Sequence, residues 1–263
     1  MNAEHRYGDV LYSHQQDSEL TRLTLLGRLT NEHTLRCLGE LRPRPEWRCL
    51  EIGAGTGHIA SVLAHEYGAT VLATDLDTSL FAPEQTSNLR IIEHDITTES
   101  FPDGHFDLIV ARYVFEHLRE RDDLVRKTVR WLRPGGSLLV EDFSDCVFDS
   151  SPNEIYAQVM GAFFRTLTET IGSDITYWAR RFPQPLAAAG LRDIGVDAAL
   201  YPCYGGGLLA EILRLSVDQL APSMISTGSV TETQIRELNA LLADPDFFDL
   251  GLISVAAWGR RVG

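Results

Sequence analysis

The chain has 263 residues, 44% of them hydrophobic, and carries a formal charge of −14 at pH 7 with a pI near 4.9. This length supplies a large α/β domain with its own core, and the acidic balance disfavours a nucleic-acid binder because it repels phosphate backbones. The scattered Cys37, Cys49, Cys146 and Cys203 lack metal-ligand spacing, so we expect reduced thiols and no metal site. Without an apolar signal core or a membrane-length apolar stretch, the sequence predicts a cytoplasmic protein.

The N-terminal part is predicted to be a helical cap. Residues 1–16 are polar and aromatic without a clear period, and they include His14, so we interpret them as an arm of the kind that covers a ligand. Leucines at helical spacing predict a first helix from Asp17, and a second helix is expected over 31–41 before the prolines that follow. We therefore expect a cap over 1–45 and a main domain over 46–263.

The central part alternates apolar strands with helices. A strand ends at Gly53 and a helix begins directly after Gly57. Further strands are predicted at 70–74, 89–92, 106–111 and 137–141, and a helix over 116–132. Polar residues end these strands: Glu51, Asp75, Asp95, Arg112 and Asp142. The alternation predicts a Rossmann-like, doubly wound, mostly parallel seven-stranded sheet, with a ligand at its carboxyl edge.

The C-terminal part is richer in helices. The patterns predict the following elements: helices 153–171 and 174–189, a strand 191–200, helices 208–220 and 231–242, and a strand 247–258. This exceeds what a simple crossover needs, so we expect a helical lid inserted after the fifth strand, around 145–190, and additional helices within 205–243. We interpret the aromatic residues Phe163, Phe164, Tyr177 and Trp178 chiefly as core, with pocket lining as the lesser alternative.

The stretch from Gly53 to Gly57 is the strongest functional signal. Its glycines let the backbone approach a ligand, and the first turn of the next helix offers unpaired N–H donors. Taken alone, this turn fits a phosphate or a sulfonium nucleoside equally well, or only a tight connection. Asp75 is suited to grip two ribose hydroxyls, unless it caps a helix, and Asp95 to accept from an adenine amine, unless it is a surface turn.

The order and spacing of several motifs narrow the choice of ligand. The motifs are CLEIGAGTG, LATDLD, EHDI, FDLIVARYVFEHL and LRPGGSLLVED, and over residues 47–142 they resemble class I S-adenosylmethionine-dependent methyltransferases. The resemblance implies a set that lines the methionine part of the cofactor: Glu51, Gly53, Ala54, Gly55 and Gly57. It also implies that Asp75 holds the ribose and Leu76 packs on adenine. Asp95 with Ile96 would read the adenine edge, and Arg112 would contact the amino-acid moiety through its backbone.

The expected activity is methyl transfer to an O, N or C atom of a small molecule. Candidates for a base are His14 and His117, although a histidine at a helix start, such as His117, is more often a cap or packing residue than a base. Tyr113 is a candidate positioning group near the methyl. A looser resemblance is to small-molecule methyltransferases of bacterial secondary metabolism. The expected partner is a small molecule, with no nucleic acid or membrane, and a homodimer is compatible with the sequence. The alternative is a cofactor-binding fold used by a cyclase, a decarboxylating enzyme or a non-catalytic binding subunit.

Overall fold

A computed structural model describes residues 18–144 and 148–263. Its centre is a seven-stranded sheet in the order β3-β2-β1-β4-β5-β9-β6. The strands are β1 Arg48–Ile52, β2 Thr70–Asp75, β3 Leu89–Glu93, β4 Phe106–Arg112, β5 Leu132–Ser144, β6 Leu191–Leu200 and β9 Ile253–Arg261. Only β9 is antiparallel to its neighbours, β5 and β6. The structure thus confirms the predicted mostly parallel, Rossmann-like sheet.

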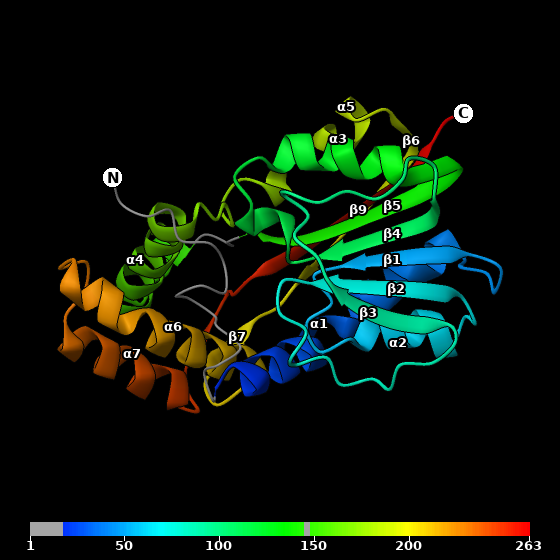
Figure 1. The fold of residues 1–263 in the computed structure, drawn as a ribbon. Coiled ribbons are helices and arrows are strands. Elements are labelled where there is room, and N and C mark those ends of the chain that lie inside the picture. Colours follow the sequence, from blue (N-terminus) through cyan, green and yellow to red (C-terminus); the bar gives the residue numbers. More distant parts are fainter. Residues whose placement is uncertain (1–17, 145–147) are drawn as a thin grey trace.

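Helices cover both faces of the sheet (Figure 1). The helices α1 Glu19–Leu41 and α2 His58–His65 lie on one face, and α3 Arg121–Trp131 and α5 Gln184–Ala188 on the other. Successive strand residues point to opposite faces. In β1 and β4, Cys49 and Leu108 belong to the core under α1 and α2, whereas Leu50 and Ile109 belong to the core under α3. Burial on both faces explains why these strands are almost continuously apolar.

A third group of helices lies beyond the carboxyl ends of the parallel strands (Figure 1). This helical layer consists of α4 Glu154–Ile171, α6 Leu208–Ser226 and α7 Glu232–Ala243, which share one apolar core. The helix α7 begins at a capping box between Thr231 and Gln234. The remaining short elements are η1 Phe115–His117, η2 Phe148–Ser150, η3 Ala179–Arg181, β7 Cys203–Tyr204 and β8 Phe248–Asp249. None of the helices within 18–144 and 148–263 is long and apolar enough to cross a membrane.

Several predicted boundaries were wrong. The two helices expected before the first strand form the single helix α1, because no proline separates them. The helix predicted over 116–132 starts only at Arg121, so Glu116 and His117 lie on the separate turn η1. The last strand, predicted over 247–258, is divided into β8 and β9.

The segment predicted as a lid contains two differently placed parts. Its first part is α4, in the helical layer. The helix expected over 174–189 is only η3 and α5, because Pro183 cannot continue a helix from η3; Pro185 lies in the first turn of α5, where proline is tolerated. These short helices pack through Trp178 onto the sheet face that carries α3. Tyr177, expected in the core, is 66% exposed.

Candidate functional site

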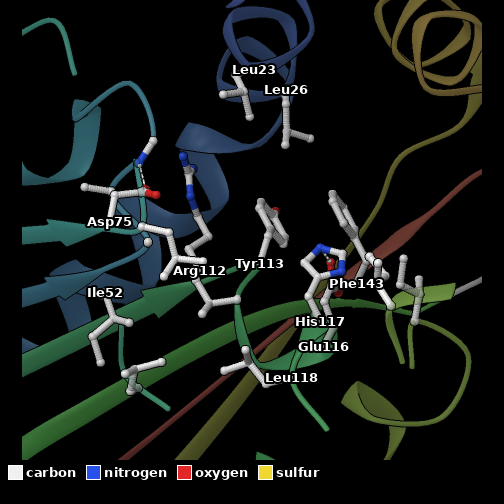
Figure 2. A pocket seen from close by; sticks show the side chains of 18 of the residues that line it. Leu23, Leu26, Ile52, Asp75, Arg112, Tyr113, Glu116, His117, Leu118 and Phe143 are labelled. Atoms are coloured by element: carbon white, nitrogen blue, oxygen red, sulfur yellow. Dashed lines mark hydrogen bonds and ion pairs between the residues drawn. The ribbon is translucent and has the colours of Figure 1, made fainter. Parts of the chain in front are cut away.

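A cavity of about 590 Å³ lies between the carboxyl edge of the sheet and the helical layer, a size typical of small-molecule sites. We call its two parts the sheet half and the helix half (Figure 2). The sheet half is lined by the strand ends: Glu51 to Thr56, Asp75, Leu76, His94 to Thr97 and Arg112. The helix half is lined by Arg22, Leu23 and Leu26 of α1, Phe143, Phe163, Phe164, Ile171, Ile175, Leu252, and Ile212, Leu213 and Ser216 of α6. Tyr113, Glu116 and His117 lie between the halves.

The glycine-rich turn forms the floor of the sheet half. Gly53 and Gly55 have φ of +69° and +52°, a region that favours glycine. A Cβ on Gly53 would lie 2.3 Å from Cγ2 of Val114, so the close packing of this turn also requires glycine. Gly57 caps α2 at φ +82° and does not line the cavity, although the resemblance implied a cofactor contact for it.

Glu51 places a buried carboxyl at the bottom of the sheet half. Its side chain is 3% exposed, and its Oε2 has no hydrogen-bond partner among the described residues. Burial raises the pKa of Glu51 to about 8, with a smaller contribution from Asp75, while Arg112 and the Ala60 amide act against the shift. A buried carboxyl with an unused oxygen is suited to receive a cationic amine.

The acidic residues that end β2 and β3 line the same half. Asp75 accepts from the amide of Gly55 at 2.8 Å, which ties the glycine-rich turn to the end of the second strand. Leu76 follows it and is 49% exposed, an apolar side chain on the wall of a polar cleft. Asp95 accepts from the amide of Thr97 at 2.8 Å, and Ile96 lies beside it. The structure therefore brings these predicted residues together at one edge of the sheet.

Arg112 links the sheet edge to α1. Its Nη1 donates to Oδ1 of Asn31 at 2.8 Å and to Oγ1 of Thr34 at 3.2 Å. These contacts hold α1 over the cavity, and they direct the guanidinium toward the helix. The sequence alone did not indicate this use of the side chain.

Tyr113 is held rigidly between the two halves. Its backbone has φ +57°, and its amide donates to the Glu141 carbonyl at 2.7 Å. Its ring stacks on Phe143 with centroids 4.1 Å apart, and its hydroxyl lies 3.0 Å from Oγ of Ser254. Burial, and secondarily the charge of Glu141, raises the pKa of Tyr113 well above its usual value. The phenol is therefore protonated at neutral pH and acts within the protein's own hydrogen-bond network.

His117 lies next to the helix half on η1. Its Nδ1 is 2.7 Å from Oγ of Ser173, and its Nε2 is 3.3 Å from Oε1 of Glu116. Burial lowers the pKa of His117 to about 3, and the charges of Arg22 and Arg121 add to this effect. The imidazole is therefore neutral at physiological pH. His14, the other predicted base, lies outside the described residues.

The helix half was largely missed by sequence reasoning. Leu23 and Leu26 show only the periodicity of an amphipathic helix, which core residues share. Phe163 and Phe164 are buried in the core of the helical layer and also line the cavity, so both interpretations apply to them. The available signal was aromatic and leucine content on helices, which does not distinguish a cavity wall from a core.

Comparisons with known sequences agree with this geometry. A methyltransferase domain family matches residues 50–140. The ubiquinone/menaquinone biosynthesis C-methyltransferase UbiE of Vibrio vulnificus is 32% identical over 201 residues, covering 70% of this chain and 75% of that protein. Phosphoethanolamine N-methyltransferase 1 of Zea mays is 30% identical over 132 residues, covering 48% of this chain and 26% of that enzyme. The chain thus spans about a quarter of the length of this plant relative.

Solved structures share the fold. Phosphoethanolamine N-methyltransferase 2 of Haemonchus contortus, in complex with phosphomonomethylethanolamine and S-adenosylhomocysteine, has a TM-score of 0.65 at 17% identity, covering 98% of this chain and 61% of that one. The YcgJ protein of Bacillus subtilis has a TM-score of 0.59 at 19% identity, covering 88% of this chain and 99% of that one. At these identities the likeness concerns the fold.

A doubly wound sheet whose glycine-rich turn and strand-end carboxyls meet in one cleft defines a nucleoside-binding α/β protein. The match to UbiE, which extends over most of both chains, narrows this class to one family. The chain belongs to the class I S-adenosylmethionine-dependent methyltransferases. The cofactor of this family is S-adenosylmethionine, as the sequence motifs predicted.

Proposed function

We propose that this protein transfers a methyl group from S-adenosylmethionine to an O, N or C atom of a small-molecule acceptor. One observation carries the proposal: the cavity is continuous from a polar half built from strand ends to a largely apolar half built mainly from helices. A cofactor in the first half would face an acceptor in the second. This arrangement is the requirement of an in-line displacement, in which alignment of the reactants supplies most of the catalysis.

The residues of the sheet half fit the cofactor group by group. The unused Oε2 of Glu51 suits the ammonium of the methionine part, and the turn at Gly53 leaves room for close backbone approach. Asp75 suits the ribose hydroxyls, and the exposed Leu76 suits an adenine face. Asp95, which lines the same half, suits the adenine amine. When bound, S-adenosylmethionine supplies an electrophilic methyl group on a positively charged sulfur.

The chain's own residues orient the acceptor and exclude water. Tyr113 and Phe143 form a rigid stacked wall beside the place where the two halves meet. The neutral His117 is fixed beside the helix half by Ser173 and Glu116, and its strongly lowered pKa makes it a weak base. We therefore assign His117 an orienting role. His14 remains a candidate base in the arm that we predict to cover the ligand.

Our remaining predictions concern the partners, the cellular location and the biological role of the protein. The charge of −14 supports our proposal that neither nucleic acid nor a membrane is the partner. The scattered cysteines support a cytoplasmic location. A homodimer and a role in bacterial secondary metabolism stay predictions.

The test is incubation with methyl-labelled S-adenosylmethionine and a panel of phenols, amines, phosphoethanolamine and enolisable ketones. Labelled product together with S-adenosylhomocysteine supports the proposal. Binding of S-adenosylmethionine that stays unchanged with every acceptor supports a non-methylating use of the fold, and absence of cofactor binding overturns both.

A matched pair of variants tests the cofactor site. Asp75→Asn removes the charge from the cavity wall and should weaken S-adenosylhomocysteine binding about 10- to 100-fold, because hydrogen bonds to charged groups are the stronger ones. Asp77→Asn changes a carboxyl two residues away that does not line the cavity. The affinity of this variant for S-adenosylhomocysteine should stay within about twofold of that of the wild type. Equal affinities in the two variants would contradict the site.

A further inference from the structure

The helix half presents an almost continuous apolar wall. Leu23 and Leu26 of α1 form one side and point into the cavity opposite Phe143 and His117 (Figure 2). The aromatic rings of Phe163 and Phe164 and the side chains of Ile212 and Leu213 come from α4 and α6 and are buried. Three helices that are distant in sequence therefore contribute apolar groups to one compartment.

The polar side chains of this compartment already have protein partners. Arg22 is bound by the Glu19 carboxylate through two contacts, 2.8 Å to Nε and 2.6 Å to Nη2, so its charge is balanced within α1. The hydroxyl of Ser216 donates to the Ile212 carbonyl at 2.7 Å within α6. Neither group offers an unbalanced charge to a ligand.

The other cations on the cavity wall are directed elsewhere. Arg112 donates to Asn31 and Thr34 of α1 at the sheet half. The side chain of Arg119 packs against Gly172. The acidic Glu116 also lines the cavity; it accepts from the Phe143 amide at 2.6 Å and lies 3.3 Å from Nε2 of His117. A charged group placed between Leu26 and Ile212 would lose its hydration while Arg22, Arg112 and Glu116 are already engaged by protein partners, which costs several kcal/mol.

We propose that the helix half binds an uncharged acceptor with a bulky or flat apolar body, which places its single nucleophilic atom toward His117 and the sheet half. That atom is a hydroxyl oxygen, the enolised α-carbon of a ketone, or an unprotonated amine nitrogen. This inference rests on the proposed methyl transfer and names its substrate class. Burial of apolar surface on these walls supplies the binding energy, about 25 cal/mol for each Å² removed from water. The rigid pair Tyr113 and Phe143 selects by shape at the place where the halves meet.

Two fluorescent probes with the same naphthol ring system test the substrate class. They are 2-naphthol and 6-hydroxynaphthalene-2-sulfonate, which differ by one charged group, and each is titrated into the full chain saturated with S-adenosylhomocysteine. We expect 2-naphthol to bind at least about tenfold more tightly, because the sulfonate must be desolvated without a partner. Equal or tighter binding of the sulfonate, or binding of neither probe, would overturn the inference.

A pair of variants on α1 locates the probe. Leu26 and Leu35 are both half-buried leucines of this helix, but only Leu26 lines the cavity. Leu26→Asn should weaken 2-naphthol binding about fivefold or more through lost apolar contact, while Leu35→Asn should leave it within about twofold. An unchanged affinity in Leu26→Asn overturns the assignment.

The cofactor titration separates the two levels of the proposal. If wild-type protein does not bind S-adenosylhomocysteine, the proposed methyl transfer fails, and the acceptor class fails with it. If it binds S-adenosylhomocysteine but does not prefer the uncharged probe, only the acceptor class fails.

Discussion

The two halves of the cavity are built in different ways. The sheet half consists of backbone turns and strand-end carboxyls between Glu51 and Arg112, a stretch that is continuous in sequence. The helix half collects side chains from α1, α4, α6 and the segment before β9. The first half depends on backbone conformation, and the second on the packing of helices. We therefore expect changes in the sheet half to act steeply on cofactor binding, and changes in the helix half to act gradually on acceptor choice.

The largest effect is expected at Gly53. Gly53→Ala places a Cβ 2.3 Å from the branched side chain of Val114 and forces an alanine to adopt φ +69°. The backbone strain costs about 1–2 kcal/mol and the overpacking about 1–3 kcal/mol. The two costs should sum, and the turn should move to relieve them. We expect S-adenosylhomocysteine affinity to fall about 100-fold and the free energy of unfolding to drop by several kcal/mol, as measured by calorimetry and urea unfolding.

Gly104 supplies the control for backbone strain. It has φ +70°, nearly the value of Gly53, and a Cβ there would meet no atom within 4 Å. Gly104→Ala should cost only the strain of about 1–2 kcal/mol and leave cofactor affinity unchanged. Equal losses of affinity in the two variants would show that the close contact with Val114 does not shape the site.

A smaller effect is expected in the pH dependence of cofactor binding. Burial raises the pKa of Glu51 to about 8 in the free protein, so the carboxyl is protonated at pH 6 to 7.5. A bound ammonium favours the carboxylate, so binding releases the proton, and the affinity should rise with pH by up to about tenfold per unit in this range. Titrations with S-adenosylhomocysteine from pH 6 to 7.5 measure this slope.

Glu51→Gln removes the titrating group without changing its size. The affinity of this variant for S-adenosylhomocysteine should hardly change from pH 6 to 7.5. Asp75 and Arg112, the charged neighbours of Glu51, remain in place in the variant. A variant that keeps the wild-type slope would assign the dependence to another group. Measuring proton release in two buffers of different ionisation enthalpy checks the same linkage independently.

The difference between the halves also explains what the sequence could predict. Gly53 and Asp75 lie on one β-α-β unit, so a short motif and the strand period were sufficient to place them together at the sheet edge. Leu26 and Ile212 are 186 positions apart, from the residue numbers 26 and 212, and no local pattern indicates that they face one cavity. Their contribution follows from how α1 and α6 pack, which a single sequence does not encode in any short window.

Errors within the predicted elements have local physical causes. The helix expected over 174–189 followed apolar spacing and gave too little weight to Pro183 and Pro185. Tyr113 could be placed at the carboxyl edge of the sheet from the end of β4, whereas the partners of its hydroxyl, on β5 and β9, depend on the complete sheet.

The smallest effect is expected at the place where the halves meet, from removal of the Tyr113 hydroxyl. This group lies 3.0 Å from Ser254 Oγ and donates to Glu141 Oε1 at 3.3 Å. Tyr113→Phe should lower the free energy of unfolding by about 0.5–1.5 kcal/mol, because a satisfied buried hydrogen bond is lost. Cofactor affinity and the methyl-transfer rate should stay within about twofold, because the stacked ring remains in place.

Tyr201 provides the matched comparison for that variant. Its hydroxyl is also buried, but it has no hydrogen-bond partner among the described residues, and it does not line the cavity. Tyr201→Phe should therefore be neutral or stabilising by up to about 1 kcal/mol, since no bond is broken and an unsatisfied group is removed. A tenfold loss of transfer rate in Tyr113→Phe, with unfolding and cofactor affinity unchanged, would instead assign the hydroxyl a direct part in catalysis. Tyr113 would then contribute to methyl transfer through its hydroxyl group, and the stacking of its ring on Phe143 would matter less.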